Sequence, residues 1–598
     1  MEKLHHNGVL VPPRYEGKSL TVKVKGKEIR LTTEQEEMAV AWAKKVGTPY
    51  VEDPVFAKNF HKDFSNKLGI EVKPGDVDYS EIIALVEEER ERKKNLPREE
   101  KKRLAAERKA VREENRERYG YAFVDGERME LANYVAEPSS IFMGRGEHPM
   151  RGSWKEGPSK DDIILNLSPD APRPEGNWQE IDWEPEAIWI ARWQDKLSGK
   201  MKYVWFSDSC SFKQQKEIEK FDKAAEFRQK LPQVKRHILK NLESDDLKRR
   251  KTATVCYLID KLKIRVGDEK DPDEADTVGA STLRREHIKI NGDGTVSFNF
   301  LGKDSVPHIF TTKLPDKVIS NLEEFASNSE ATLFGGVRSS HVSEFLDEVM
   351  TGLSAKVFRT LYASDAVKTK LDKTPVESED PEYVKKYVAK MANLEAAKVC
   401  NHKRTIPKRW KASLEKKKDR LEIIKKRAKD AQAKIKQRMK DWTRKHEERL
   451  AKQEERLKAA VEKLEDTMRQ LEEKEKQGKD VSVLKKRVKR QREAVTRQKQ
   501  RIRDIKAKQV ERMEKLKQSL EKRKQRDISA VEKMKLNITI QGETRDYNLS
   551  TSLKSYIDPR IYYEWGKQVE YDWKQYYQKA LHKKFSWVDT QDDKTENC

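Results

Sequence analysis

The sequence HEERLAKQEERLKAAVEKLEDTMRQLEEKEKQG, residues 446–478, decides how the chain is organised. Leucine recurs in it at every seventh position, as Leu450, Leu457, Leu464 and Leu471. A seven-residue apolar step in a stretch rich in Lys, Arg, Glu and Gln is typical of a coiled coil rather than of a globular helix. The sequence on both sides of this stretch continues the pattern.

The repeat belongs to a longer helical segment that runs from about residue 411 to residue 535. This segment has no proline and only one glycine, Gly478, a composition that favours long helices. The positions that keep the step on the two sides are Leu414, Leu421, Ala428, Ile435 and Trp442, and then Val488, Val495, Ile502 and Leu516. We predict an antiparallel helix pair that turns at 476–480, with arms of about 60 residues and roughly 90 Å.

The chain as a whole is strongly basic. It has 598 residues, and 127 Lys and Arg against 103 Asp and Glu give a formal net charge of +24. Such an excess indicates a polyanionic partner, nucleic acid first. The length predicts several structural units, and the 12 Trp, 18 Tyr and 17 Phe can build their cores. Wholesale disorder is therefore not expected.

The apolar pattern and the cysteines argue against a membrane or secreted protein. No apolar run approaches the roughly 18 to 20 residues of a membrane span, and the first residues lack the apolar segment of a signal peptide. The four cysteines are scattered without a CxxC pair, so neither a disulfide framework nor a cysteine zinc site is supported. We expect a soluble intracellular protein.

The region before the helical segment mixes short strands and helices. Within residues 1–208, the run at 188–193 predicts a strand with bulky apolar residues on both faces. Ser80 can cap a helix, and after the break at Pro97 a second, highly charged helix continues to about Arg118. These two helices predict a solvated basic prong.

The other regions carry the more apolar helices and a hairpin. Residues 209–410 have apolar helical periods interrupted by a β-hairpin over 288–302, and they are the best candidate for a compact catalytic or binding core. At the C-terminal end, the run at 536–540 predicts a short strand, followed by a small Tyr- and Trp-rich unit.

Nucleotide and metal sites are not indicated. The tripeptide Gly17-Lys18-Ser19 resembles the end of a phosphate-binding loop, but Pro12 stands where that loop requires its first glycine. There is no HExxH motif, no EF-hand loop and no His/Cys cluster at ligand spacing, since Cys400 and His402 lack partners. We therefore expect neither ATP nor a metal ion as a cofactor.

Four cationic side chains stand beside apolar stretches instead of on charged faces: Arg265, Lys303, Arg359 and His402. A guanidinium in such a place can donate two parallel hydrogen bonds to a phosphate. Taken singly, however, an arginine beside an apolar helix is more often structural, with its stem lying on the apolar surface. A tyrosine in a polar turn, such as Tyr556, is usually only a surface residue.

The order of these residues is what makes them informative. The two arginines, the lysine and the histidine are followed far downstream by Ser550-Thr551-Ser552-Leu553-Lys554-Ser555-Tyr556. This order resembles the active site of eukaryotic-type DNA topoisomerase IB. Short sequence motifs around these residues also resemble motifs of that family, at 144–149, 264–270, 275–279, 300–305, 353–360, 400–402 and 556–560. The resemblance covers nearly the whole chain.

The resemblance implies a catalytic set and a reaction. Tyr556 would attack a backbone phosphate of duplex DNA, forming a 3'-phosphotyrosyl link and releasing a 5'-hydroxyl. Arg265, Arg359 and His402 would bind the non-bridging oxygens, and Lys303 would act as general acid for the departing 5'-oxygen. Rotation of the free end would then relax supercoils, with religation needing neither ATP nor metal.

The resemblance also implies an α+β multidomain clamp. A mixed N-terminal lobe and a mainly helical catalytic core with a β-hairpin would precede a long antiparallel coiled-coil linker and a small C-terminal domain that carries the tyrosine. The expected boundaries are 1–208, 209–410, 411–535 and 536–598. The expected partner is double-stranded DNA, bound by a monomer mainly through its phosphates. The residues expected to contact DNA are Arg145, Lys155, Asp304, Lys356 and Ser555.

The sequence departs from the family pattern in a few places. Leu553 follows Ser552 where the family commonly has lysine, and the lysine is Lys554. Ser555 replaces a common asparagine, and Met143 replaces a usual arginine. The high content of charged residues is typical of proteins from organisms that grow at high temperature, and it favours an archaeal source. The expected location is the cytoplasm or nucleoid of an archaeon, or the nucleus of a eukaryote.

Two other classes of protein remain open from the residues alone. A tyrosine recombinase or integrase shares the cations and the tyrosine, but it places the tyrosine close behind the last motif residue. Here His402 and Tyr556 are 154 positions apart. A non-catalytic architectural coiled-coil protein that binds DNA would explain the charge and the repeat, but not the ordered motifs.

Overall fold

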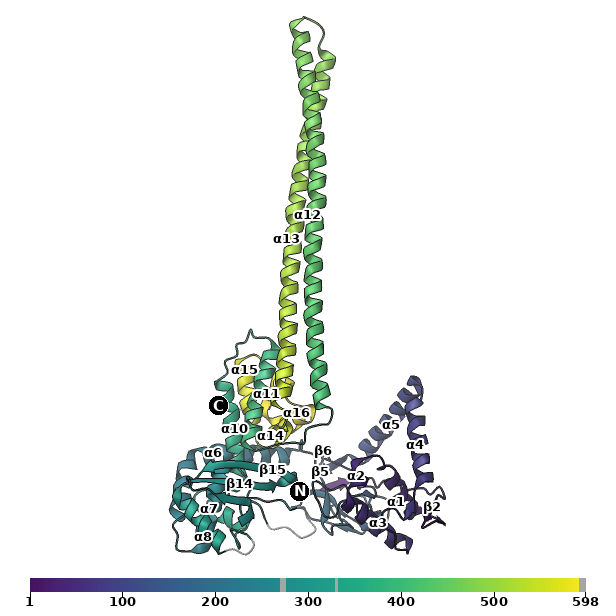
Figure 1. Ribbon diagram of the computed structural model, residues 1–598, viewed down its shortest axis with the longest axis vertical. Coiled ribbons are helices and arrows are strands. Elements are labelled where there is room, and N and C mark those ends of the chain that lie inside the picture. Colours follow the sequence, from purple (N-terminus) through teal and green to yellow (C-terminus); the bar gives the residue numbers. More distant parts are fainter. Residues whose placement is uncertain (269–275, 329–331, 591–598) are drawn as a thin grey trace. The chain divides into compact units, whose positions relative to one another are not determined.

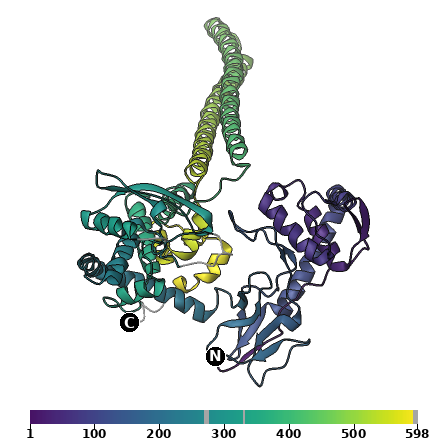
Figure 2. The ribbon, with the colours of Figure 1, turned by 60° about the horizontal axis from the view of Figure 1, so that its bottom comes forward.

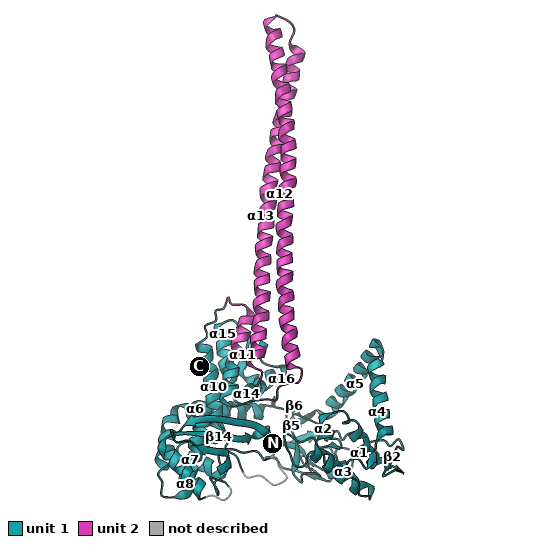
Figure 3. Cartoon of the chain, in the orientation of Figure 1, with its two compact units in different colours: residues 1–378, 392–404, 547–598 teal, residues 379–391, 405–546 magenta. Residues whose placement is uncertain are grey.

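The computed structural model describes residues 1–268, 276–328 and 332–590, which form two compact units (Figure 3). Unit 1 comprises residues 1–378, 392–404 and 547–598, and unit 2 comprises residues 379–391 and 405–546. The described residues are mainly helical and include small sheets of two to four strands. The structure is therefore of the α+β, multidomain kind that the sequence predicts.

The N-terminal part of unit 1 is built on small sheets. In the largest, of order β10-β9-β11-β12, β11 (Trp189–Gln194) pairs antiparallel with β9 and β12. It confirms the predicted strand, and Trp189, Ile190 and Trp193 are all buried. The other strands are β1 (Leu4–His6), β2 (Thr21–Val24), β3 (Lys27–Arg30), β4 (Val77–Asp78), β5 (Tyr121–Val124), β6 (Glu127–Glu130), β7 (Ser140–Ile141), β8 (Trp154–Lys155), β9 (Ile163–Asn166), β10 (Glu180–Asp182) and β12 (Met201–Trp205).

Both helices predicted for the prong are present, but only the second is solvated throughout, since Ile82 and Val86 of the first are buried. Helix α4 (Ser80–Asn95) and helix α5 (Arg98–Tyr119) meet near Pro97, and α5 buries no residue (Figure 1). Ser80 is not the cap that the sequence suggests. It is the first helical residue, and Asp78 Oδ1 accepts hydrogen bonds from its amide at 2.9 Å and its hydroxyl at 2.5 Å. The other helices here are α1 (Thr33–Ala43), α2 (Pro49–Glu52) and α3 (Pro54–Leu68).

The core that follows is mainly helical. Its long helix α6 (Ser211–Asn241) packs on α10 (Ala355–Asp372), where the rings of Phe227 and Phe358 lie 4.5 Å apart. Both phenylalanines are fully buried, so this contact fixes the two helices against each other. The other helices of the core are α7 (Leu247–Leu262), α8 (Asp316–Ser327) and α9 (Ser339–Asp347). Helix α11 (Glu382–Val399) runs from unit 2 into unit 1.

The predicted hairpin lies in this core and is part of a three-stranded sheet. Strand β13 (Ile288–Ile290) pairs antiparallel with β14 (Thr295–Gly302), which pairs along its length with β15 (Val306–Lys313). Val296, Phe298 and Phe300 are buried, because every second residue of β14 faces the helices.

Unit 2 contains two long helices that run antiparallel, α12 (Trp410–Lys476) and α13 (Ser482–Glu543) (Figure 1). The chain turns between them at 477–481, as the sequence predicts, and Gly478 there adopts a left-handed φ of 62° that favours glycine. At the other end, Trp410 Nε1 donates to Gln541 O at 3.3 Å, and Gln541 Nε2 donates to Trp410 O at 3.2 Å.

The seven-residue repeat marks the side on which each long helix faces the other. Val488, Val495 and Ile502 of α13 are buried, and the four leucines of the α12 repeat are half-buried. Trp442 differs from the pattern, since 37% of it is exposed, while His446 next to it in space is buried. The interface between the helices therefore includes polar positions that the repeat does not reveal.

The strand predicted at 536–540 is wrong, because α13 continues through these residues to Glu543. Ile538 and Ile540 alternate with polar residues there as in a strand, but β propensity is weak when tertiary packing continues a helix. The C-terminal unit expected to begin at 536 therefore starts in the structure with the end of a long helix.

The Tyr- and Trp-rich tail forms a small helical cluster beside α10, drawn in yellow in Figure 2. Tyr562 is buried at its centre, with its ring 5.0 Å from that of Tyr576 and 5.8 Å from that of Tyr577. These aromatic contacts supply the core that a short segment needs. Its helices are α14 (Leu549–Ser555), α15 (Pro559–Gln568), α16 (Lys579–Lys584) and α17 (Trp587–Thr590).

We predict that Ile502→Ala weakens the packing of α12 on α13 by about 2 kcal/mol, because it removes buried methyl groups. Amide hydrogen exchange of the full chain should rise in both helices around this position. Val510→Ala is the matched control, since Val510 lies on the same helix and is 71% exposed. Equal exchange in the two variants would contradict the assignment of the buried face.

Candidate functional site

Tyr556 follows the last residue of α14, and only 5% of it is exposed. Its ring lies against two of the residues predicted to act with it. The ring centroid is 4.8 Å from the guanidinium carbon of Arg359 and 5.1 Å from the ring centroid of His402. The structure thus brings together three residues that are far apart in the sequence.

The backbone around His402 explains how the tyrosine reaches this place. Asn401 takes a left-handed φ of 50° and turns the chain after α11. His402 O then accepts a hydrogen bond from Asn548 N at 2.7 Å, and Lys403 forms an antiparallel bridge with Tyr547. The segments on the two sides of the long helices are therefore joined directly beside the site.

The side chain of His402 is held at both ring nitrogens. Its Nδ1 lies 2.7 Å from Ser552 Oγ, and its Nε2 lies 3.2 Å from Arg359 Nη2. Arg359 Nη2 also donates to Cys400 O at 2.7 Å. Because a guanidinium can only donate, Nε2 is the acceptor. The proton of a neutral imidazole is then on Nδ1, which donates to Ser552.

Burial and positive neighbours keep His402 uncharged. Loss of hydration, together with the charges of Arg359 and Arg265, lowers its pKa from 6.5 to about 3. A neutral histidine beside a charged arginine avoids the repulsion that two cations would have in a buried place. The site therefore carries its positive charge on the arginines.

Arg359 is buried, at 4% exposure, and its Nε has no hydrogen-bond partner among the residues that the structure describes. A buried, unpaired donor on a charged group is costly. An anion bound beside Tyr556 would satisfy this donor. Arg265 is exposed just beyond α7, and its charge acts on both His402 and His308. The arrangement is suited to binding a phosphate group next to a tyrosine.

Lys303 is exposed and begins the short turn of Lys303–Ser305 that joins β14 to β15. Strand β15, which follows this turn, passes near Arg359 and Arg265. His308, further along β15, is near enough to Arg359 and Arg265 that their charges help burial to lower its pKa to about 4. The side chain of Asp304 lies outside the described part of the structure, as do residues 269–275 of two quoted motifs.

The Gly-Arg-Gly motif of the N-terminal part lies beside the same turn. Arg145 is exposed between two glycines with left-handed φ angles, 63° at Gly144 and 59° at Gly146. A Cβ added at Gly146 would clash with the side chain of Ser305. This close approach needs glycine, and it carries Arg145 close to the turn that begins at Lys303.

The remaining predicted DNA contacts are differently placed. Lys155 is not a free cation, because it forms ion pairs with Glu137 and, at 2.7 Å, with Asp195. Its side chain is only 12% exposed, so a direct phosphate contact would have to displace a carboxylate. Lys356 is exposed in the first turn of α10, and Ser555 is half-buried directly before the tyrosine.

Sequence reasoning missed several residues that touch this site. Ser552 lies within the quoted motif, but nothing in the motif indicates that its hydroxyl binds His402. Ser364 on α10 donates to Tyr556 O at 3.2 Å and accepts from Asp558 N at 3.1 Å. The structure shows where the residues at the family's lysine position lie. Leu553, which stands at that position, is buried, while Lys554 is exposed and pairs with Asp208 at 3.5 Å.

The described residues provide neither a cluster of metal ligands nor a helix that could span a membrane. They contain no group of three or more His, Cys, Asp or Glu side chains that could hold a metal ion. None of the described helices is both long enough and apolar enough to cross a membrane.

A buried tyrosine packed on an arginine and a histidine, with a second arginine whose charge acts on that histidine, is an arrangement suited to binding an anion beside the tyrosine. Models of known protein families match most of the chain. The family of the eukaryotic DNA topoisomerase I DNA binding fragment matches residues 1–206, and the family of the eukaryotic DNA topoisomerase I catalytic core matches residues 209–435. The family of the C-terminal topoisomerase domain matches residues 528–596. The chain belongs to the eukaryotic-type DNA topoisomerase IB family.

Individual relatives are similar over different lengths. DNA topoisomerase 1 beta of Arabidopsis thaliana is 36% identical over 438 residues, which is 71% of this chain and 47% of that protein. DNA topoisomerase 1 of Candidozyma auris is 34% identical over 439 residues, 71% of this chain and 58% of that protein. Human DNA topoisomerase 1 is 28% identical over 618 residues, 99% of this chain and 71% of that protein. The aligned part is thus about half the length of the plant relative.

We predict that His402 stays neutral between about pH 5 and 8, because its pKa is lowered to about 3. In the unfolded chain it titrates near 6.5, so the unfolded state binds more protons between these two values. Its contribution to the free energy of unfolding should therefore fall as the pH drops through this window. Histidine NMR signals, assigned with His402→Gln, provide the measurement. A midpoint above about pH 5 would contradict the prediction.

Proposed function

We propose that this protein is a type IB DNA topoisomerase, which relaxes supercoiled duplex DNA by cutting one strand, allowing rotation and resealing the strand. The observation that carries the proposal is the packing of Tyr556 against Arg359 and His402, with Arg359 Nε left without a partner among the described residues. Membership of the family supports the same reaction.

The chemistry begins at Tyr556. Its phenol loses its proton to solvent water as the oxygen attacks a backbone phosphorus, the bond from phosphorus to the 5'-oxygen breaks, and a 3'-phosphotyrosyl ester and a 5'-hydroxyl result. Because a phenol of ordinary pKa about 10 is a weak nucleophile at neutral pH, the site must stabilise the charge that develops on the phosphate. Arg265, Arg359 and His402 donate to the non-bridging oxygens.

His402 can make its contact by a change of tautomer. A phosphate oxygen that takes over Arg359 Nη2 leaves His402 Nε2 without its donor. The hydroxyl of Ser552 can donate as well as accept, so it can donate to Nδ1 when Nε2 carries the proton. The neutral histidine then donates from Nε2 to the phosphate and adds no charge to the site.

Lys303 supplies the proton for the departing 5'-oxygen. The ester with Tyr556 keeps the energy of the broken phosphodiester, so resealing is the reverse attack by the 5'-hydroxyl. No step of this scheme consumes ATP or uses a metal ion.

Residues 1–208 and 209–410 form the two parts of a clamp around the duplex, in this proposal. The close approach of Gly146 to Ser305 supports it, since the two residues belong to the two proposed parts. Arg145, Asp304, Lys356 and Ser555 contact the DNA, and Lys155 does so by exchanging one of its carboxylate partners for a phosphate. Contacts that are mainly to phosphates give little sequence specificity and a strong dependence on salt.

The long helices, proposed as a coiled-coil linker over 411–535, influence rotation rather than chemistry. The C-terminal domain, proposed as 536–598, supplies the tyrosine. The enzyme acts as a monomer in a compartment that holds DNA, the nucleus in a eukaryote or the nucleoid in an archaeon.

A plasmid relaxation assay tests the proposed activity directly. Supercoiled plasmid is incubated with the protein in the presence of EDTA and without ATP, and the topoisomers are separated on a gel. We expect a ladder of relaxed forms. Site-specific recombination products would support a recombinase instead, and binding without relaxation would support an architectural protein.

We predict that Tyr556→Phe abolishes relaxation and covalent attachment to DNA while leaving DNA affinity unchanged, because it removes one oxygen and no phosphate contact. Gel shifts measure affinity, and denaturing gels of a labelled oligonucleotide measure attachment. A Phe variant that still becomes covalently attached would refute the assignment of the nucleophile.

We predict that Lys303→Ala slows cleavage of ordinary DNA by about a hundredfold or more, the usual contribution of a general acid. A substrate with sulfur in place of the bridging 5'-oxygen should be cleaved at nearly the wild-type rate, because a thiolate leaves without a proton. Equal slowing on both substrates would mean that Lys303 acts by charge or structure alone.

A further inference from the structure

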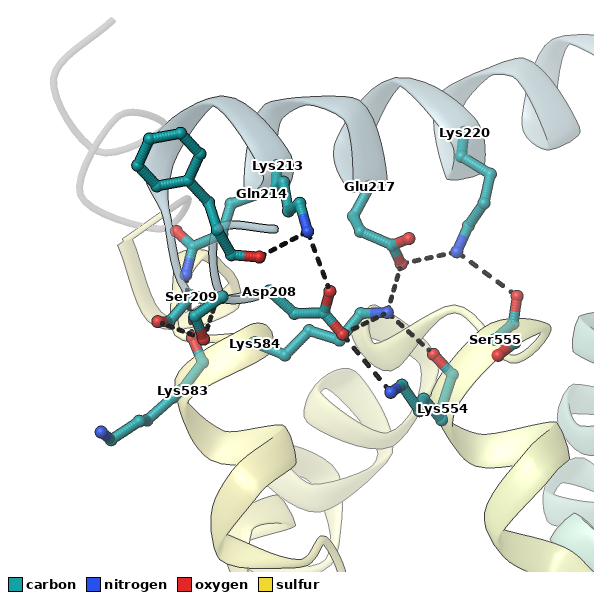
Figure 4. Close-up of polar contacts among 12 residues, drawn as sticks. Asp208, Ser209, Lys213, Gln214, Glu217, Lys220, Lys554, Ser555, Lys583 and Lys584 are labelled. Atoms are coloured by element: carbon teal, nitrogen blue, oxygen red, sulfur yellow. Dashed lines mark hydrogen bonds and ion pairs between the residues drawn. The ribbon is translucent and has the colours of Figure 1, made fainter. Parts of the chain in front are cut away.

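The backbone just before and at Tyr556 is held by side chains from three other helices. Helix α14 is short, and the carbonyl groups at a helix C-terminus lack partners within the helix. Here Lys554 O accepts from Lys584 Nζ at 3.2 Å, and Ser555 O accepts from Lys220 Nζ at 3.3 Å (Figure 4). Tyr556 O accepts from Ser364 on α10 at 3.2 Å.

The two lysines are themselves fixed by one carboxylate. Glu217 Oε2 lies 2.6 Å from Lys220 Nζ and 3.3 Å from Lys584 Nζ, so it lies between them (Figure 4). Asp208 lies 3.8 Å from Lys584 Nζ on its other side. The side chains of Lys220 and Lys584 are only 15% and 7% exposed. These are built contacts, unlike the mobile ion pairs of a protein surface.

Keeping a cation in this place has a cost. Loss of hydration lowers the pKa of Lys220 from 10.5 to about 8, although Glu217 acts in the opposite direction. The charges of Lys584 and Lys356 contribute to this lowered value. A helix terminus on the surface could leave its carbonyl groups to water at no such cost. The burial of two ammonium groups here therefore calls for a reason other than stability.

The contacts link the tyrosine to the arginine that it faces. Lys220 lies on α6, and α6 is packed against α10, which carries Arg359, through Phe227 and Phe358. The hydrogen bond to Ser555 O thus ties the peptide group before Tyr556 to the same frame as Arg359. Lys584 ties the preceding peptide group to this frame through Glu217, which is also on α6.

We infer that Lys220 and Lys584 are positioning residues for Tyr556, which hold the end of α14 so that the phenol oxygen lies in line for attack. This inference rests on the proposed function, because it concerns the nucleophile of that reaction. Neither lysine needs to touch DNA. Since errors of about 1 Å in the placement of a reacting group can cost on the order of a hundredfold in rate, small losses of order at α14 should be visible in catalysis.

The test compares Lys220→Met and Lys584→Met with two control variants. Methionine keeps most of the length of lysine but cannot donate a hydrogen bond. Lys216→Met on α6 and Lys579→Met on α16 are the controls, because these lysines are exposed on the same two helices. Single-turnover cleavage of a short suicide oligonucleotide is measured at saturating protein, and affinity is measured in the Tyr556→Phe background.

We expect Lys220→Met and Lys584→Met each to slow cleavage by about tenfold or more, with affinity and thermal unfolding close to those of the controls. The oligonucleotide with a bridging 5'-sulfur should be slowed equally, because the defect is in the nucleophile and not in the leaving group. This pattern differs from that of Lys303→Ala. Lys220→Arg, which can still donate to Ser555 O, should recover most of the rate.

Wild-type rates in both methionine variants would overturn the inference, as would a loss that is fully accounted for by weaker DNA binding. If a methionine variant does not fold, Glu217→Gln decides the matter, since it preserves shape and removes the charge that holds both lysines. A Glu217→Gln protein that is folded and cleaves at the wild-type rate would also overturn it. A wild-type chain that forms no covalent complex would instead refute the proposed function itself.

Discussion

One backbone contact closes the chain beside the candidate site, the hydrogen bond from Asn548 N to His402 O. All of α12 and α13 lies between these two residues in the sequence, so the contact closes a very long loop of the chain. Closing such a loop costs entropy, and the antiparallel return of the helices reduces that cost by bringing the chain back close to its starting point. This closure brings the segment that carries Tyr556 back to His402, and the side chains of Ser552, Lys220 and Ser364 then fix the segment there.

The charges of the site follow from the same closure. Packing Tyr556 onto Arg359 and His402 removes water from the guanidinium, and in such surroundings its attraction for an anion is stronger than at the surface. The histidine adapts by staying neutral, with Ser552 holding its second nitrogen. The positive charge at the tyrosine is therefore placed before any substrate arrives, and little reorganisation is left for the reaction.

Sequence patterns predicted local structure well where one pattern repeated, and less well where distant packing decided the outcome. The seven-residue step predicted the long helices and their turn, and the alternation in β14 predicted its buried face. The residues at 536–540 looked like a strand because of Ile538 and Ile540, yet they extend α13. The order of motif residues pointed to Tyr556 and its neighbours. The lysines at the end of α14 could not be found this way, since one precedes the tyrosine by hundreds of residues and the other follows it.

The reciprocal hydrogen bonds between Trp410 and Gln541 have a consequence for how this segment can change during evolution. They fix the register of α12 and α13 at one end, and the turn at Gly478 fixes it at the other. An insertion in one helix alone would rotate its apolar stripe away from its partner. Length can therefore change only by matched additions or losses in both arms, in steps of about seven residues, so related chains should differ in the reach of this segment far more readily than in its base.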